Sequence, residues 1–129
     1  MLRNGFLKMT KNEAYHSFLT AFGWTVYDEN TVPDDATLPR LTYNFADAEF
    51  GTPVLLSVSA WDRSHSWSNV TEMADDIYDG IGLGGKILTY DDGYIWVKRG
   101  QPFAQRMSDE NDSIRRIVIN LEVEFLTHK

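Results

Sequence analysis

Residues 115–125 carry a regular alternation of side chains, and this pattern limits the possible folds more than any other feature of the sequence. Successive side chains of a β-strand point to opposite faces of its sheet. The segment is therefore predicted to be a long strand with one face in a hydrophobic core. Apolar residues take every second position and charged or amide residues take most of the others: Ile117, Ile119, Leu121, Val123 and Phe125 against Arg116, Asn120, Glu122 and Glu124.

A similar alternation predicts two more strands earlier in the chain. Residues 40–45 place Leu41 and Tyr43 on one face, and residues 54–61 alternate in the same way. Gly51-Thr52-Pro53 lies between the two segments and is typical of a turn. The two strands are expected to form an antiparallel hairpin.

A second hairpin is predicted over residues 86–90 and 94–98. The segment between them contains Asp92-Gly93, a pair that favours a tight turn with positive φ. Residues 100–113 follow, with a proline and an acidic cluster, and are expected to be a loop.

Two segments have the periodicity of helices. Thr10 and Glu13 form a capping-box pattern, which predicts a helix over residues 11–22. The second helix is predicted over residues 69–80, with Asn69 as a cap and an apolar stripe that follows it.

In chain order these segments are a helix, two strands, a helix and three strands. The order predicts an α+β fold, with a twisted and mainly antiparallel sheet of about five strands flanked by two helices. Residues 28–39 are polar and are expected to be an exposed connection. No Pro/Gly/Ser-rich stretch divides the chain, so residues 1–129 are expected to form one domain.

Composition argues against several classes of function. The chain has no cysteine, so disulfides, thiolate metal sites and cysteine nucleophiles are excluded. Its formal net charge is −7, which disfavours binding to nucleic acid. No apolar run approaches the roughly 20 residues of a membrane helix, and residues 1–10 lack the apolar core of a signal peptide. A protein made and used in a reducing cytoplasm fits these features.

No recognisable set of catalytic or metal-binding residues is present. His16, His65 and His128 are not at metal-ligand spacing, and neighbouring acids such as Asp91-Asp92 do not face a common substrate. The glycines between residues 80 and 85 follow a helix and precede a strand, the reverse of a phosphate-binding loop. We therefore expect no enzyme activity, no cofactor and no metal.

Aromatic and arginine residues near strand ends and in loops are better candidates for function. Tryptophan and arginine are enriched in the energetic centres of protein interfaces. Trp96 is as consistent with a small core as with an interface. The predicted interface residues are Phe50, Trp61, Arg63, Trp67, Arg99, Phe103 and Arg106.

Several segments resemble small proteins of long-tailed bacteriophages, known as tail terminator, tail completion or minor capsid proteins. These segments are Leu41–Val54, Val58–Trp67, Gly85–Ile87, Gly93–Gly100 and Pro102–Met107. Together they span roughly residues 38–126.

The resemblance implies a ring, commonly hexameric, that ends the tail tube and joins it to the head connector. The implied partners are other copies of the chain, the tail tube protein and the head-connector protein, and the implied location is the virion tail, assembled in the host cytoplasm. A closed ring needs two different patches on each subunit. One expectation is that Trp61, Arg63 and Trp67 form one patch and that Phe103 and Arg106 form the other.

Two alternatives stay open at this point. The first is another head–tail connector or minor capsid role, which would share the same size, acidity and aromatic residues. The second is a small ligand-binding α+β domain, with a pocket between helix 69–80 and the sheet that uses Asp75, Tyr78 or Arg115.

Overall fold

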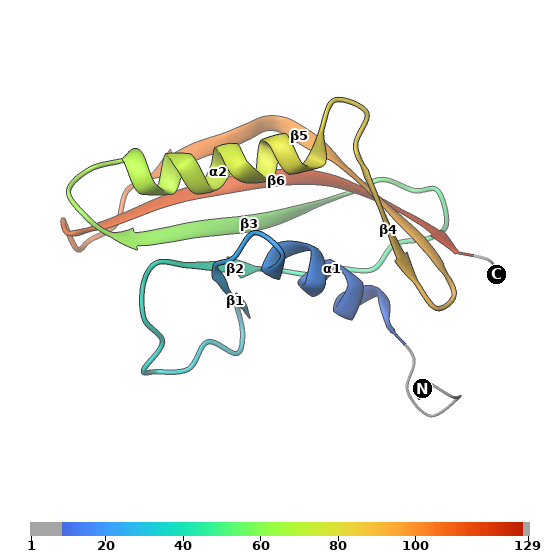
Figure 1. The fold of residues 1–129 in the computed structure, drawn as a ribbon, viewed down its shortest axis with the longest axis horizontal. Helices are drawn as coiled ribbons and strands as arrows, with labels where there is room; N and C mark the ends of the chain where they lie inside the picture. Colours follow the sequence, from blue (N-terminus) through green and yellow to red (C-terminus); the bar gives the residue numbers. More distant parts are fainter. Residues whose placement is uncertain (1–8, 128–129) are drawn as a thin grey trace.

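The computed structural model describes residues 9–127, which form one six-stranded sheet and two helices (Figure 1). The strand order is β1-β2-β3-β6-β5-β4. Only β1 and β2 pair in parallel, and the other pairs are antiparallel. The predicted α+β class is confirmed, with a mixed sheet. In chain order the elements are α1 (Lys11–Thr20), β1 (Thr25–Asp28), β2 (Arg40–Tyr43), β3 (Val54–Arg63), α2 (Ser68–Ile81), β4 (Lys86–Tyr90), β5 (Gly93–Met107) and β6 (Ile114–Thr127).

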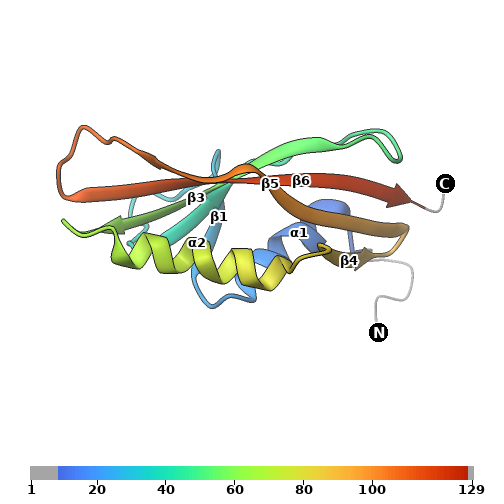
Figure 2. The same ribbon diagram turned by 90° about the horizontal axis from the view of Figure 1, so that it is seen from above.

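Both helices lie on the same face of the sheet (Figure 2), which we call the covered face. Helix α2 packs on it through an apolar stripe, which contacts the apolar residues of β3 and β6. The opposite face, which we call the open face, has no helix over it among residues 9–127. Buried residues of the core include Tyr15, Leu19, Leu56, Val58, Met73, Ile77, Ile119, Leu121 and Phe125.

Strand β5 corrects the prediction of a loop over residues 100–113. The strand runs to Met107, and its last four residues pair with β6. Between Arg99 and Ala104 the register shifts, and Pro102, which has no backbone N–H to give to a ladder, lies in this interruption. The prediction failed there because the glycine and proline were taken as the end of the strand. Only residues 108–113 connect β5 to β6.

Strand β1 was not predicted. It has four residues and pairs in parallel with β2 at the edge of the sheet. Only Val26 among its residues is buried, so it offers too little alternation to be recognised as a strand.

Three local details differ from the sequence-based expectations. The β4–β5 turn is present, but Gly93 is the first residue of β5 and does not have positive φ. Helix α2 begins at Ser68 with Trp67 at the cap position, so Asn69 is not the cap. Instead the Asn69 amide donates to Asp62 Oδ2 at 2.8 Å and ties the helix to β3. The capping box of α1 is confirmed, and that helix ends at Thr20.

Candidate interaction surfaces

A straight row of three side chains crosses the open face, and we call it the arginine row. Arg40 on β2 lies opposite Trp61 on β3, and Trp61 lies opposite Arg116 on β6. The guanidinium carbon of Arg40 is 5.9 Å from the centre of the indole ring, and that of Arg116 is 4.6 Å from it. Both distances are within the range of a cation–π contact.

Hydroxyl groups of the sheet hold the arginine row in place. The Trp61 Nε1–H donates to Thr42 Oγ1 at 2.9 Å. Arg116 donates through Nε and Nη2 to Ser59 Oγ at 3.2 and 3.1 Å. Thr42 and Ser59 are each only 6% exposed, so the row covers them. The indole ring of Trp61 and the guanidinium group of Arg116 therefore have defined positions on the isolated chain, which lowers the entropy cost of binding a partner.

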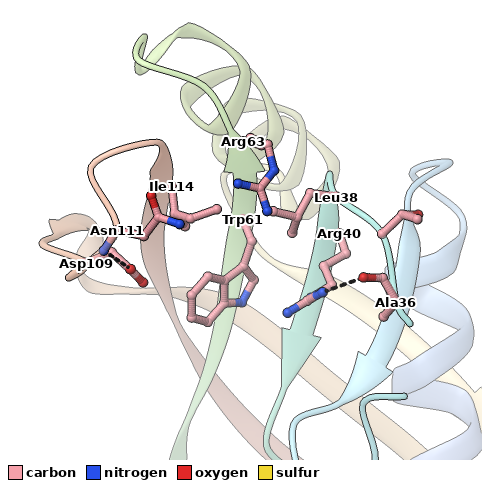
Figure 3. Close-up of a pocket in the computed structure, with 9 residues that line it drawn as sticks. Ala36, Leu38, Arg40, Trp61, Arg63, Asp109, Asn111 and Ile114 are labelled. Carbon is pink, nitrogen blue, oxygen red and sulfur yellow. Dashed lines mark hydrogen bonds between the residues drawn. The ribbon is translucent and has the colours of Figure 1, made fainter. Parts of the chain in front are cut away.

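A pocket of about 640 Å³ lies beside the arginine row (Figure 3). Arg40, Trp61 and Arg63 line one side of it, and the 108–113 connection contributes Asp109 and Asn111 to the other side. Arg63 is exposed and donates to Ser113 Oγ at 3.2 Å. Arg40 donates to the Ala36 carbonyl at 3.3 Å, while its buried Nε has no acceptor within residues 9–127.

Positive charge at this site is not neutralised within the part of the chain that the structure describes. Arg40, Arg63 and Arg116 form no ion pair with a carboxylate of residues 9–127. Most N–H donors of these guanidinium groups are unused. Unpaired cations on an otherwise acidic chain make this end of the open face a candidate surface for an anionic partner.

The other end of the open face is internally paired. Lys98 Nζ lies 3.0 Å from Glu124 Oε1 and 3.1 Å from Glu122 Oε2. Hydrogen bonds to Glu124 and then Glu122 raise the pKa of Lys98 above its ordinary value. Lys98 also lies over the Trp96 ring at 4.1 Å, and the Trp96 indole donates to the Gly84 carbonyl. This end is therefore stabilised without a partner.

Trp67 and Arg106 lie together, which corrects their assignment to two separate patches. The Arg106 guanidinium lies 4.8 Å from the Trp67 ring, and that of Arg115 lies 5.4 Å from it. The extended β5 places Arg106 opposite Ile117, so its side chain is on the covered face. Trp61 projects from the open face instead, so it does not share one patch with Trp67.

Arg99 and Phe103 also pack on their own chain, around Tyr78 of α2. The Arg99 guanidinium lies 3.4 Å from the centre of the Tyr78 ring and donates twice to the Tyr78 carbonyl, at 3.1 and 2.9 Å. The Phe103 ring is 5.1 Å from the Tyr78 ring and packs against the core. Phe50 is different: it lies in the β2–β3 connection and is 64% exposed.

Sequence reasoning missed two members of the arginine row, Arg40 and Arg116. The signal was present, because the predicted hairpin and the alternation of β6 already placed both residues on the face opposite the core. It also missed two exposed leucines, Leu55 (63% exposed) and Leu83 (95% exposed). Single apolar side chains on a surface carry little signal in a sequence.

The alternative pocket between α2 and the sheet is not formed by the residues named for it. Asp75 is exposed, Tyr78 packs with Arg99, and Arg115 packs with Trp67 at the other end of α2. Those two ends are about 15 Å apart along the helix. The space between helix and sheet is filled by the buried apolar stripe of α2.

Histidines do not form a common site in the structure. His16 is half-buried, and its Nδ1 is 3.1 Å from the Tyr43 hydroxyl, while His65 is exposed. His128 and most of residues 1–10 lie outside the described residues. Among residues 9–127, no group of three potential metal ligands is found. No helix in the same range is long and apolar enough to span a membrane.

The fold is similar to a chain in the solved virion of a native gene transfer agent (GTA) particle. The TM-score is 0.54, the sequence identity is 20%, and the match covers 83% of each chain. At this identity the likeness shows a shared fold. No protein-family model matches the chain, and no curated protein matches it at a significant level.

Proposed function

We propose that the protein is a structural subunit of a phage or prophage virion, and that it forms a ring that ends the tail tube and joins it to the head connector. One observation carries the proposal: an open sheet face with ordered but unpaired arginines, in a fold shared with a chain of a gene transfer agent virion. A ring subunit needs surfaces that other chains cover. The resemblance of residues 38–126 to tail terminator proteins supports a position at the end of the tail tube.

The partners follow from this role. They are neighbouring copies of the chain, the tail tube protein and the head-connector protein, and the protein acts in the virion tail after assembly in the host cytoplasm. The role is non-enzymatic and requires no cofactor. Among the predicted interface residues, Trp61 and Arg63 line the pocket of the open face and Phe50 is exposed, so these three are the first candidates for these contacts.

A binding experiment with assembly intermediates tests the proposal. Purified protein is mixed with tail tubes that lack a terminator, with completed tails and with connector-bearing capsids, and each mixture is sedimented and imaged by electron microscopy. We expect co-sedimentation with bare tubes, a ring at one tube end, and no binding to completed tails. Binding to capsids alone would favour another connector role, and binding to none of the three would contradict a role at the head–tail junction.

A further inference from the structure

Helix α2 carries a continuous acidic stripe on the side that faces away from the sheet. Its members are four residues at helical spacings of three and four, and all four are exposed: Glu72, Asp75, Asp76 and Asp79. The apolar stripe that packs on the sheet lies on the other side of the helix. The helix contains no lysine or arginine.

These carboxylates have no partner within the described chain. None of them forms a hydrogen bond or an ion pair with a residue in the range 9–127. Four like charges within two turns repel one another, at a cost that an opposite surface would relieve. The stripe alone has an ordinary explanation as a solvated helix face. A role in binding requires a complementary cationic surface elsewhere on the molecule.

The arginine row lies on the opposite side of the molecule. It projects from the open face, whereas α2 lies on the covered face (Figure 2). The carboxylates of α2 are exposed on the side of the helix away from its buried stripe. Arg40, Arg63 and Arg116 are as free of ion pairs as the carboxylates of α2. The molecule therefore has an unpaired cationic surface on one side and an unpaired anionic surface on the other.

We infer that these two surfaces bind each other between copies of the chain, so that the α2 stripe of one subunit lies against the arginine row of the next and against Arg63 beside that row. Different patches in contact make this a heterologous interface, which closes into a ring when the rotation between neighbours allows it. The inference rests on the proposed ring and names the contact that builds it. Guanidinium–carboxylate hydrogen bonds would set the registry, and Trp61 would supply apolar area between the arginines.

Disulfide cross-linking tests the contact and removes only one charge from each of the two surfaces. The chain has no cysteine, so the variant Arg63→Cys/Asp76→Cys carries only the two introduced thiols. They lie on opposite sides of one subunit and cannot join within it. Under mild oxidation, in the presence of tail tubes, we expect a ladder of covalent oligomers that ends at the size of the ring.

The two single variants, Arg63→Cys and Asp76→Cys, are the matched controls. In a heterologous interface neither thiol meets its own copy, so each control stays monomeric on a non-reducing gel. A ladder from the double variant with monomeric controls supports the inference. Dimers from a single variant, or rings seen by microscopy without a ladder, overturn it.

Charge exchange provides a second, independent measurement. Arg40→Glu/Arg63→Glu places like charges on both surfaces, and Asp75→Lys/Asp76→Lys does the same with opposite sign. Each is expected to lower ring yield at least about tenfold, because like charges placed face to face repel each other across the interface. The chain with all four substitutions restores opposite charges, and a mixture of the two double variants does so as well. Both are expected to recover rings, and failure of both to recover them while every variant stays folded by circular dichroism overturns the inference.

The outcomes separate this inference from the proposed function. Rings on tail tubes with no cross-link between positions 63 and 76 would leave the tail role intact and reject the interface. A covalent ladder from protein that binds neither tubes nor capsids would keep the interface and reject the tail role.

Discussion

On the covered face of the sheet, most residues of β3 and β6 are apolar and buried, whereas on the open face the same strands carry arginine, tryptophan, serine and glutamate. On the covered face, the stabilising free energy comes from burial of apolar side chains against the chain's own helices. The open face has polar contacts at one end and unpaired charge at the other. A sheet with this asymmetry is stabilised by packing on one side and leaves the other side for the assembly contacts proposed above.

The largest expected difference between the two faces concerns adjacent leucines on β3. Leu56 is 1% exposed on the covered face, and Leu55 is 63% exposed on the open face. Leu56→Ala is expected to lower the free energy of unfolding by about 3 kcal/mol through lost burial and a cavity. Leu55→Ala is expected to lower it by less than about 0.5 kcal/mol. Equal midpoint shifts of the two variants in urea would contradict the contrast.

Trp61 tests how much the open face contributes to the stability of the free chain. Trp61→Phe keeps an aromatic ring between two arginines but loses the N–H that donates to Thr42 Oγ1. We expect a loss of about 1.5 kcal/mol, since the substitution also removes part of the cover over a buried hydroxyl. Thermal and chemical denaturation measure the loss. Trp67→Phe serves as a comparison, because the indole N–H of Trp67 donates no hydrogen bond to the part of the chain that the structure describes. A loss as large as that of Leu56→Ala would mean that the open face is a second core.

Two buried tyrosines on the covered side should respond to loss of their hydroxyls with opposite signs. The Tyr15 hydroxyl is buried with no hydrogen-bond partner among residues 9–127, and burial strongly raises its pKa. The Tyr43 hydroxyl lies 3.1 Å from His16 Nδ1 and 3.4 Å from Asn12 Oδ1. Tyr15→Phe is expected to stabilise the protein by about 1 kcal/mol, and Tyr43→Phe to destabilise it by about 1 kcal/mol. Calorimetry of both variants gives the signs, and a destabilised Tyr15→Phe would indicate a partner for that hydroxyl.

The smallest expected effect is a pH dependence at the surface. A hydrogen bond from Lys11 to Asp47, 2.8 Å long, lowers the pKa of that carboxyl below its ordinary value of 3.8. A lowered folded pKa means that the contribution is present above the ordinary pKa and is lost as pH falls through the folded value. Because Asp47 is mostly exposed, the contribution is expected to be below about 0.5 kcal/mol. Asp47→Asn should lower stability slightly at pH 7 and not at pH 2, as measured by urea titration at both values.

The sequence predicted the covered face better than the open face, for a physical reason. Burial imposes a period of two on β3 and β6 and a helical period on α2, and such periods are visible in a single sequence. The position of Arg106 was not visible, because it depends on the continuation of β5 past Pro102. The partnership of Arg40 with Trp61 required the register of the hairpin as well as its existence. The edge strand β1 was missed because its stability comes from pairing and not from a pattern of its own.

The register shift in β5 has a consequence for the lengths that this segment can take. From Arg99 to Ala104 the strand advances five positions, while its partner β6 advances two, from Leu121 to Ile119. The excess is odd, so odd-numbered residues face the helices before the shift and even-numbered residues face them after it. Deleting one residue there would exchange the faces of the strand's last residues and send Arg106 to the open side. Only length changes by an even number would preserve which residues face the helices.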